Sequence, residues 1–431
     1  MKKVLSGIMI LLSLTAFSQA NDYSNLWHSI DSLEVAGKVA TANEQTVSLM
    51  KKSLKAKDFE HYIKSKIYHY RLYQINHENS NQYILKDINT AIGKLPAPFK
   101  NVLLSYKAKI LMDYFRHNRW QIRERSQINN PDNKDLDTWS LKTLKDSIQA
   151  TFEASIKNEE VLIETPNSEI ITLLAQNPVN RKYQPSLYDL LSRRLLDYYS
   201  ESSFFTSEFS DSQFGFPKEQ LFSPGVEFYN LQIDPEKSSS SRALKQYQRL
   251  ESLHAKKEET EALIFWTLER LKFAKNELNN DAANKNFTAA MEKLSEKYQE
   301  QKIQAMINFA SAYHYYELGK ETNLDGEMEN PEYLTKSYEL LERITSKYAN
   351  TASAQHAIRL KAKITAPHLN SKIQGFLASG EPGRIFVSYK NIDTLYYKVF
   401  QVSRNFLKGI SYRDRHAYVR KKQEISKIVL L

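Results

Sequence analysis

The chain has 431 residues, more than the roughly 100 to 200 residues of one ordinary domain, which predicts two or three structural units. Only 11 Gly and 12 Pro are present, and since sandwiches and barrels need many turns, helices are favoured. A hydrophobic content of 41% is enough to build cores and argues against global disorder. The absence of cysteine excludes disulfides, thiolate metal sites and a cysteine nucleophile.

The formal net charge of +10 is concentrated near the C-terminal end. From Arg384 onward, 11 Lys or Arg residues stand against three acidic ones. Without this tail and the two lysines near the N-terminus, residues 21–383 contain 47 basic and 47 acidic residues. A neutral body with one short basic end lacks the basic stripe that follows a phosphate backbone, so we expect no nucleic-acid partner.

The first residues have the layout of a secretory signal. Lys2 and Lys3 precede an apolar stretch over residues 4–17, and small residues then stand at Ser18 and Ala20. This predicts a cleaved signal peptide over residues 1–20 and export to the periplasm or cell envelope. An uncleaved membrane anchor is the alternative, but the apolar run is shorter than the roughly 20 residues of a span. No cysteine is available for a lipid anchor, and we expect that the chain does not span the membrane after signal cleavage.

Residues 21–201 predict an N-terminal helical domain. Apolar residues recur there at spacings of three and four, interrupted by short breaks, which is typical of consecutive amphipathic helices that pair as hairpins. The helical pattern of residues 101–117 gives way to a polar stretch over residues 118–134, which predicts a loop. Further on, Pro185 and Ser186 precede a helix with one wide apolar stripe.

Residues 202–238 are rich in Phe and Ser and predict a long connecting excursion whose Phe side chains must be buried. Residues 239–380 then predict a second helical domain. Its clearest part is a helix after Asn330 and Pro331, followed by a partner in which Ala354, Ala357, Ile358, Ala362 and Ile364 allow close approach. The pair spans about 35 residues, near the period of about 34 in tetratricopeptide units. Residues 301–318 predict an earlier helix of the same stack.

The pattern changes to alternation after Gly383. Ile385, Val387 and Tyr389 lie on one side of an extended segment, and a second such segment follows a break at residues 391–393. Residues 427–431 predict the start of another strand. The expected fold is therefore mostly α, with stacked helical hairpins in a TPR-like α-solenoid, followed by a short, incomplete β-sandwich segment over residues 381–431.

No constellation of reactive residues stands out. His61, His69 and His77 are eight residues apart, so successive rings rotate by about 80° around a helix instead of converging on a metal. His314 is flanked by aromatic residues and is expected to pack. Acidic residues cluster at 159–160 and at 258–261, as is usual for solvated helix faces. We therefore predict no catalytic, cofactor-binding or metal-binding residue, and the sequence leaves a binding site unassigned.

The segment RIFVSYKNIDTLYYKVFQV resembles the start of the macroglobulin-like β-sandwich in alpha-2-macroglobulin family proteins of the Bacteroidota type. The matching positions are Asn391 after the first strand, then Leu395, Tyr396, Lys398 and Val399. The segment SLYDLLSRRLLDYYSE, residues 186–201, is similar to a recurrent helix of the same proteins' N-terminal region. The resemblance implies an exported helical scaffold before a series of β-sandwich domains, with a family role in trapping or inhibiting proteases at the envelope.

The chain also departs from this family. Covalent trapping uses a thioester between cysteine and glutamine, which a chain without cysteine cannot form. Residues 384–431 supply 48 residues, whereas a sandwich domain needs about 100 residues and about seven strands. We therefore expect an N-terminal fragment of a longer product, or a truncated gene. The expected partners are downstream β-sandwich domains of the same protein and, through the family role, proteases.

Two alternatives remain open from the sequence. The chain could be an independent helical-repeat module that binds a peptide or a glycan on a Tyr-lined concave surface. It could also be an all-helical periplasmic hydrolase with two carboxylates in a cleft, although no pair of residues can be named for that role. Neither GxSxG, nor the elements of penicillin-binding enzymes, nor a Gly-rich phosphate loop occurs in the sequence.

Overall fold

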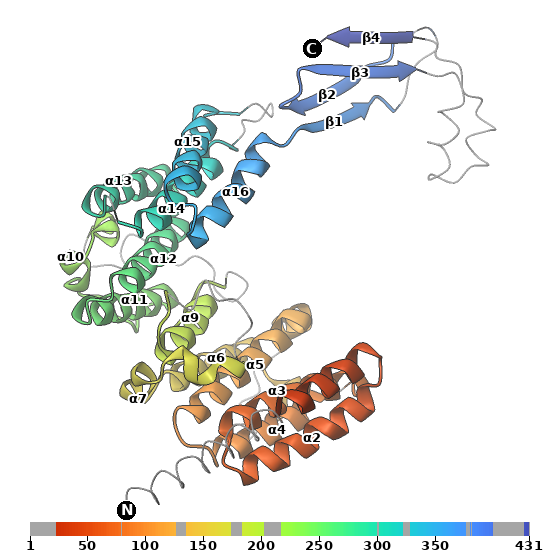
Figure 1. The fold of residues 1–431 in the computed structure, drawn as a ribbon, viewed down its shortest axis with the longest axis vertical. Coiled ribbons are helices and arrows are strands. Elements are labelled where there is room, and N and C mark those ends of the chain that lie inside the picture. The colour runs from red at the N-terminus through yellow and green to blue at the C-terminus, as the bar shows by residue number, and fades with distance from the viewer. Residues whose placement is uncertain are drawn as a thin grey trace, which may run out of the picture. The chain divides into compact units, whose positions relative to one another are not determined.

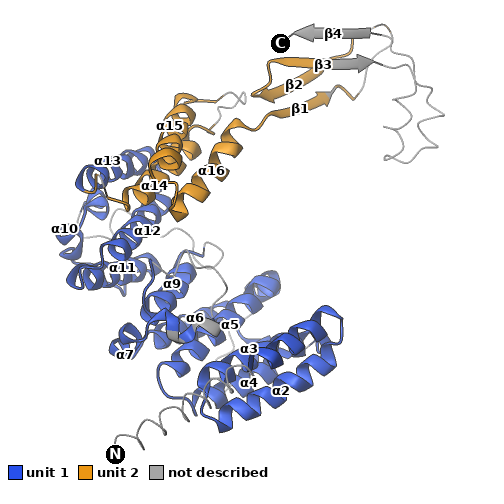
Figure 2. Ribbon diagram, viewed as in Figure 1, with its two compact units in different colours: residues 1–297 blue, residues 298–431 orange. Residues whose placement is uncertain are grey.

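A computed structural model describes most of the chain in two compact units, residues 1–297 and 298–431 (Figure 2), and each is considered separately below. The predicted signal peptide lies outside the described residues, as does the first part of the Phe/Ser-rich excursion. The described residues are 23–78, 80–125, 135–173, 183–201, 217–299, 301–321, 328–375, 380, 382–399 and 426–430.

The first unit is built from helices, most of which pack against the next helix along the chain (Figure 1). This confirms the predicted mostly α fold of stacked helical hairpins. None of the described helices has both the length and the hydropathy that crossing a membrane would require. The elements in chain order are a helix over residues 23–35, α2 (Val39–Lys55), α3 (Phe59–Asn76), α4 (Ser80–Ile92), α5 (Phe99–Glu124), η1 (Leu136–Thr138), α6 (Leu141–Ser155), α7 (Glu159–Glu164), η2 (Asn167–Leu173), α9 (Leu187–Tyr199), η3 (Lys218–Phe222), α10 (Val226–Tyr229), α11 (Ser239–Lys256), α12 (Thr260–Leu278) and α13 (Asp281–Lys297).

The first hairpin shows how the apolar spacing becomes a core. Trp27 and Ile30 of the first helix are buried against Leu49 of α2 and Leu72 of α3. The helix over residues 23–35 ends because Gly37 takes a φ of +72°, a left-handed conformation that glycine adopts without a steric penalty. The amide of Lys38 then donates to the carbonyl of Leu33, which closes the helix end and lets α2 fold back.

The loop predicted over residues 118–134 is wrong in its first part, because α5 continues to Glu124. Ile122 is fully buried and extends the apolar face of Tyr114 and Phe115 by two further turns. Residues 116–121 carry polar side chains and the exposed Trp120, so the local pattern did not show that the helix continues to Ile122. Residues 126–134 of the predicted loop lie outside the described residues.

The described part of the excursion lies close to the helices that follow it. Leu221 and Phe222 of η3 and Phe228 of α10 are buried, which agrees with the expected burial of Phe side chains from this segment. α10 packs against α11, and η3 packs against α12 and α13. The segment over residues 217–238 thus packs against the first unit through its buried apolar side chains and is not a free linker.

In the described residues of the second unit, three helices surround one core: α14 (Gln304–Leu318), α15 (Glu332–Lys347) and α16 (Ala352–Thr365). The predicted pairing of α15 with α16 is confirmed, as is the earlier helix of the stack. Each helix contributes to this core, for example through Ala312 of α14, Leu341 of α15 and Ala357 of α16. Ile358 and Ala362 were expected on the packed face, but Ile358 is 58% exposed and Ala362 is exposed as well, because Ala354, Ala357 and Ile364 occupy that face.

The strands form two short antiparallel pairs. β1 (His368–Ile373) pairs with β2 (Ile385–Lys390), and β3 (Thr394–Val399) pairs with β4 (Ser426–Leu430). The alternation after Gly383 and the strand near the end of the sequence are therefore confirmed. β1 is an addition, since the sequence predicts no strand before Gly383. Within this additional strand, Leu369 stands opposite Tyr389 of β2.

Candidate functional site

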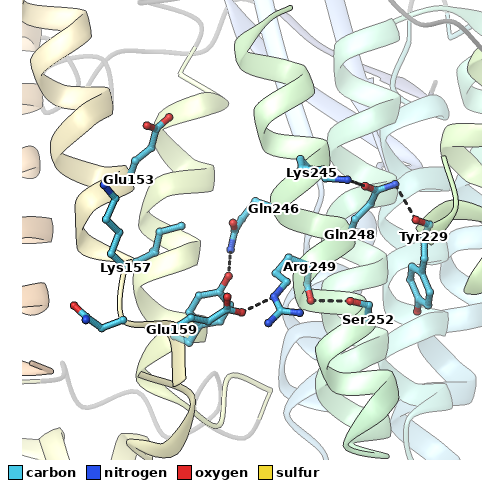
Figure 3. A pocket seen from close by; sticks show the side chains of 12 residues that line it. Glu153, Lys157, Glu159, Tyr229, Lys245, Gln246, Gln248, Arg249 and Ser252 are labelled. Carbon is cyan, nitrogen blue, oxygen red and sulfur yellow. Dashed lines mark hydrogen bonds and ion pairs between the residues drawn. The ribbon is translucent and has the colours of Figure 1, made fainter. Parts of the chain in front are cut away.

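A cleft of about 710 Å³ opens in the first unit between the end of α6 and α11 (Figure 3). Glu153 and Lys157 lie on one side, and Lys245, Gln246 and Arg249 face them from α11. The helix α6 ends just before Asn158, which takes a left-handed φ of 65° and lets α7 start at an angle. The lining residues are Glu153, Ile156, Lys157, Asn158, Glu159, Tyr188, Tyr229, Lys245, Gln246, Gln248, Arg249 and Ser252.

The cleft carries an excess of positive charge. Glu159 forms an ion pair with Arg249, and Glu153 forms one with Arg242 at 3.3 Å. Lys157 and Lys245 have no carboxylate partner within the part of the chain that the structure describes. Lys245 Nζ donates only to the amide oxygen of Gln248, at 3.1 Å. Because the two carboxylates are neutralised and the two ammonium groups are not, the cleft favours a ligand with negative charge.

Tyr188 is buried, lines the cleft and holds Gln246 in place. The Gln246 amide donates to the Tyr188 hydroxyl oxygen at 3.0 Å and to Ser192 Oγ at 2.9 Å. Burial raises the pKa of Tyr188 to about 12, so the hydroxyl stays protonated at neutral pH. Tyr188 can therefore orient a ligand through hydrogen bonds but cannot serve as a base near pH 7.

The residue after Tyr188 belongs to a network of polar groups in the core. Asp189 is fully buried, and its Oδ1 accepts hydrogen bonds from His254 Nε2 at 2.7 Å and from Trp266 Nε1 at 2.8 Å. Its Oδ2 accepts from the backbone amide of Ser186 at 3.0 Å and from the Ser186 hydroxyl at 2.5 Å. Ser186 and Asp189 form a capping box at the start of α9. The network ties α9 to α11 and α12.

His254 faces a carboxylate on each side. Its Nδ1 lies 2.6 Å from Glu259 Oε2, so both ring nitrogens must carry hydrogen if both contacts are hydrogen bonds. Burial is the largest influence on the pKa of His254 and lowers it, but the hydrogen bonds and charges of Asp189 and Glu259 together raise it above its ordinary value. In a hydrolase triad the histidine accepts the serine proton, whereas Ser186 here donates to Asp189 and not to His254. The arrangement is that of a structural contact and not of an activated nucleophile.

A second buried ion pair anchors the excursion. Arg270 and Glu251 are both fully buried, with Arg270 Nε 2.8 Å from Glu251 Oε1. The guanidinium also donates to the carbonyl oxygens of Leu221 and Ser223 in and just after η3. It stacks over the Phe228 ring at 4.0 Å. Arg270 therefore fixes the segment that contributes Tyr229 to the cleft.

The histidines singled out in the sequence contact different groups. His61 lies 3.0 Å from Asp58, His69 lies 2.8 Å from Asn43, and the His77 ring stacks on Tyr73 at 3.8 Å. His314 is buried, in line with the expected packing role. Among the residues that the structure describes, no group of three or more His, Asp or Glu side chains could hold a metal ion.

The sequence pointed to Glu159 and Glu259, but it did not identify the buried charged residues that lie behind the cleft. Glu159 borders the cleft and Glu259 contacts His254, so both acidic clusters have one member with a definite partner. Asp189 and Arg270 were not predicted. The available signal was a charged residue inside an apolar stripe, since Asp189 stands among leucines and Arg270 follows the segment ALIFWTLE.

A further polar contact joins the strands of the second unit to its helices. Asn391 follows β2 with a left-handed φ of 54°, which asparagine tolerates better than most residues. Its side-chain amide donates to the carbonyl oxygens of Ile364 at 2.9 Å and of Ala366 at 3.3 Å. These carbonyls lie at the C-terminal end of α16, where a helix leaves its last acceptors without intrahelical partners. Asn391 thus caps α16 from the strand segment.

Comparisons with protein-family models, with curated proteins and with solved structures find no match to this chain. Function has to be inferred from the geometry of the cleft, from the buried networks and from the contact made by Asn391. The short motifs around Ser186 and Asn391, which carried the family resemblance, both prove to be capping positions.

Proposed function

We propose that the chain is a non-catalytic helical scaffold region of an exported alpha-2-macroglobulin-like protein. Its family-level role would be protease inhibition or trapping at the periplasm or cell envelope. The local role would be to hold β domains of the same protein through packed helices. The observation that carries the proposal is the contact of Asn391 with the end of α16, because it couples a helical core to a strand segment.

The face of the first strand pair supports the same role. In the β1–β2 register, Leu369 stands opposite Tyr389, and Ile385 lies on the same face. Leu369 is 48% exposed and Ile385 is 53% exposed. A strand pair with an exposed apolar face is suited to packing against a second sheet, as in a β-sandwich. The opposite face carries the polar residues His368, Asn370 and Lys372, together with Phe386, which is 66% exposed.

The proposal is tested by assaying the purified chain, with the predicted signal peptide over residues 1–20 removed, against a panel of serine, cysteine and metalloproteases. We expect no inhibition with a protein substrate and no inhibition with a small peptide substrate, because a scaffold has no trapping part of its own. Inhibition by this chain would assign trapping to the helices and overturn the division of roles. Hydrolysis of a peptide or glycan by the chain would contradict the non-catalytic assignment.

The cleft beside α11 favours a second function, that of a helical-repeat module that binds a peptide or glycan. Its volume is in the usual range for ligand sites, roughly 300 to 1,000 Å³. Tyr188 and Tyr229 line it. So do Lys157 and Lys245, the two lysines that have no carboxylate partner among the described residues. The full chain should then bind an acidic peptide or a uronate-containing glycan saturably, and Lys245→Ala should weaken binding about tenfold. Equal affinity of the variant and the parent would contradict this function.

A further inference from the structure

A second cleft, of about 780 Å³, lies in the first unit between α4 and α5 and differs in character from the first. α4 contributes Gln82, Leu85, Lys86, Asn89 and Thr90, which recur at helical spacing and so share one face. α5 contributes Lys107 and Leu111, which are one turn apart. Asp135 and Trp139, on either side of η1, complete the lining.

Lys107 is the unusual group of this cleft. Its side chain is half-buried, and it has no ion-pair partner among the described residues. Burial alone lowers the pKa of Lys107, which means that no carboxylate close to the ammonium group offsets the loss of water. A half-buried cation without a counter-charge is less favourable in the free protein than a fully solvated one. An anionic ligand that reached Lys107 would remove that penalty.

The surroundings of Lys107 are apolar on one side. Leu111 is fully buried one turn further along α5, while Leu85 and Trp139 are half-buried and line the same cleft. A leucine floor and an indole ring suit the body of a flat or aliphatic molecule. Asn89 and Thr90 also line the cleft and are polar and exposed.

Asp135 limits the charge that the cleft can accept. Its Oδ1 accepts from the Gln82 amide at 2.6 Å and from the backbone amide of Asp137 at 3.1 Å. These contacts fix a negative charge at the edge of the cleft. A ligand with two negative charges would be repelled by it, whereas a monoanion could keep its charge on Lys107 and its apolar part away from Asp135.

We propose that this cleft binds a monocarboxylate with an apolar aromatic or aliphatic body. Lys107 binds the carboxylate, and Leu85, Leu111 and Trp139 contact the body. The carboxylate comes either from a free organic acid or from the C-terminus of a peptide that ends in an apolar residue. This inference is independent of the scaffold function and of the first cleft, since it uses a different pair of helices.

The experiment is calorimetric titration of the full chain with 3-phenylpropionate, with 3-phenylpropionamide as the neutral probe. We expect saturable binding of the acid and at least tenfold weaker binding of the amide, a difference typical of about one charge-assisted hydrogen bond. Acetyl-Gly-Gly-Phe as the free acid identifies the source: binding comparable to that of the small acid favours a peptide C-terminus, and its failure favours a free acid. Failure of both acids to bind overturns the proposal.

Variants separate binding from folding. Lys107→Met should abolish binding of the acid, while Lys107→Arg should retain it in part. Lys107→Met should leave the thermal midpoint unchanged or higher, because it removes a half-buried cation that has no counter-charge, so its loss of binding cannot be attributed to unfolding. Lys86→Met changes an exposed lysine of the same cleft and should alter affinity less than about threefold. Unchanged affinity in Lys107→Met, or equal affinity for acid and amide, would refute the assignment.

Discussion

At the scale of single residues, the first unit depends on charged side chains placed where water cannot reach them. Asp189, Glu251, His254 and Arg270 are each at most 1% exposed, and each has at least two hydrogen bonds. A buried charge is tolerated only when its partners replace water, so the loss of one partner costs more than the pair itself contributes. Two predictions follow from this asymmetry.

The first concerns pH. The pKa of His254 is raised in the folded protein, so the contribution of its contacts to the free energy of unfolding is fully present below the ordinary pKa of about 6.5. That contribution declines as pH rises through the higher folded-state pKa. The groups facing the imidazole are Asp189 from α9 and Glu259 from the turn after α11. Urea denaturation of the parent chain should therefore show decreasing stability across this range.

His254→Gln should flatten that pH dependence, because glutamine does not titrate. His28→Gln, on an exposed side chain, is the matched control and should keep the profile of the parent. If His254→Gln retained the full slope, another group would be responsible for the pH dependence.

The second concerns the pair of Glu251 and Arg270. Arg270→Met leaves Glu251 buried without its counter-charge and frees the carbonyls of Leu221 and Ser223. We expect a loss of about 3 to 5 kcal/mol in the free energy of unfolding, measured by denaturant titration. The double variant Glu251→Gln with Arg270→Met should lose less than the sum of the single losses. Lys142→Met, in an exposed ion pair with Asp146, should change stability by less than about 1 kcal/mol.

At the scale of the elements, α14 and α15 approach each other closely where Gly319 meets Leu334. A Cβ atom added to Gly319 would lie 2.8 Å from both the backbone nitrogen and Cγ of Leu334. Gly319→Ala should therefore push the two helices apart and destabilise their packing by about 1 to 3 kcal/mol. Gly93 follows α4 and is the matched control, since its added Cβ would meet atoms at ordinary distances of 3.7 and 3.8 Å.

Hydrogen exchange can locate this effect. All four tryptophans lie in the first unit, so tryptophan fluorescence reports on that unit alone. In Gly319→Ala, the amides of α14 and α15 should exchange faster while the tryptophan transition stays where it is in the parent. Slow exchange equal to that of the parent would mean that Leu334 moves aside without cost.

The elements also show what the sequence could and could not predict. Ser186 was recognised as the start of a helix because a capping residue followed by an apolar stripe is a local signal. α5 was predicted too short because one distant residue, Ile122, holds its last turns through tertiary contact. β1 was missed because its sequence HLNSKI gains strand structure only by pairing with β2. The same reasoning applies to the first cleft, since α6 and α11 are far apart in sequence, and to the second, where residues around η1 join the consecutive helices α4 and α5.

At the scale of the molecule, the proposed role depends on how firmly the strand segment of the second unit is attached to its helices. Asn391 provides two hydrogen bonds to the end of α16, and its φ of 54° is strained for most residues. Asn391→Gly removes the amide without adding backbone strain, because glycine adopts this conformation freely. The variant therefore isolates the contribution of the hydrogen bonds.

We expect Asn391→Gly to lower the local stability of the attachment by about 1 to 2 kcal/mol, the usual worth of one or two hydrogen bonds. The amides of β1 and of the last turn of α16 should then exchange about five- to thirtyfold faster. Proteolytic cleavage near Ala366 should accelerate by a similar factor, with helical circular dichroism unchanged. Asn370→Ala, an exposed position on β1, is the control and should show neither effect. If exchange in Asn391→Gly equals that of the parent, the strands are held by other contacts and the scaffold proposal loses its main support.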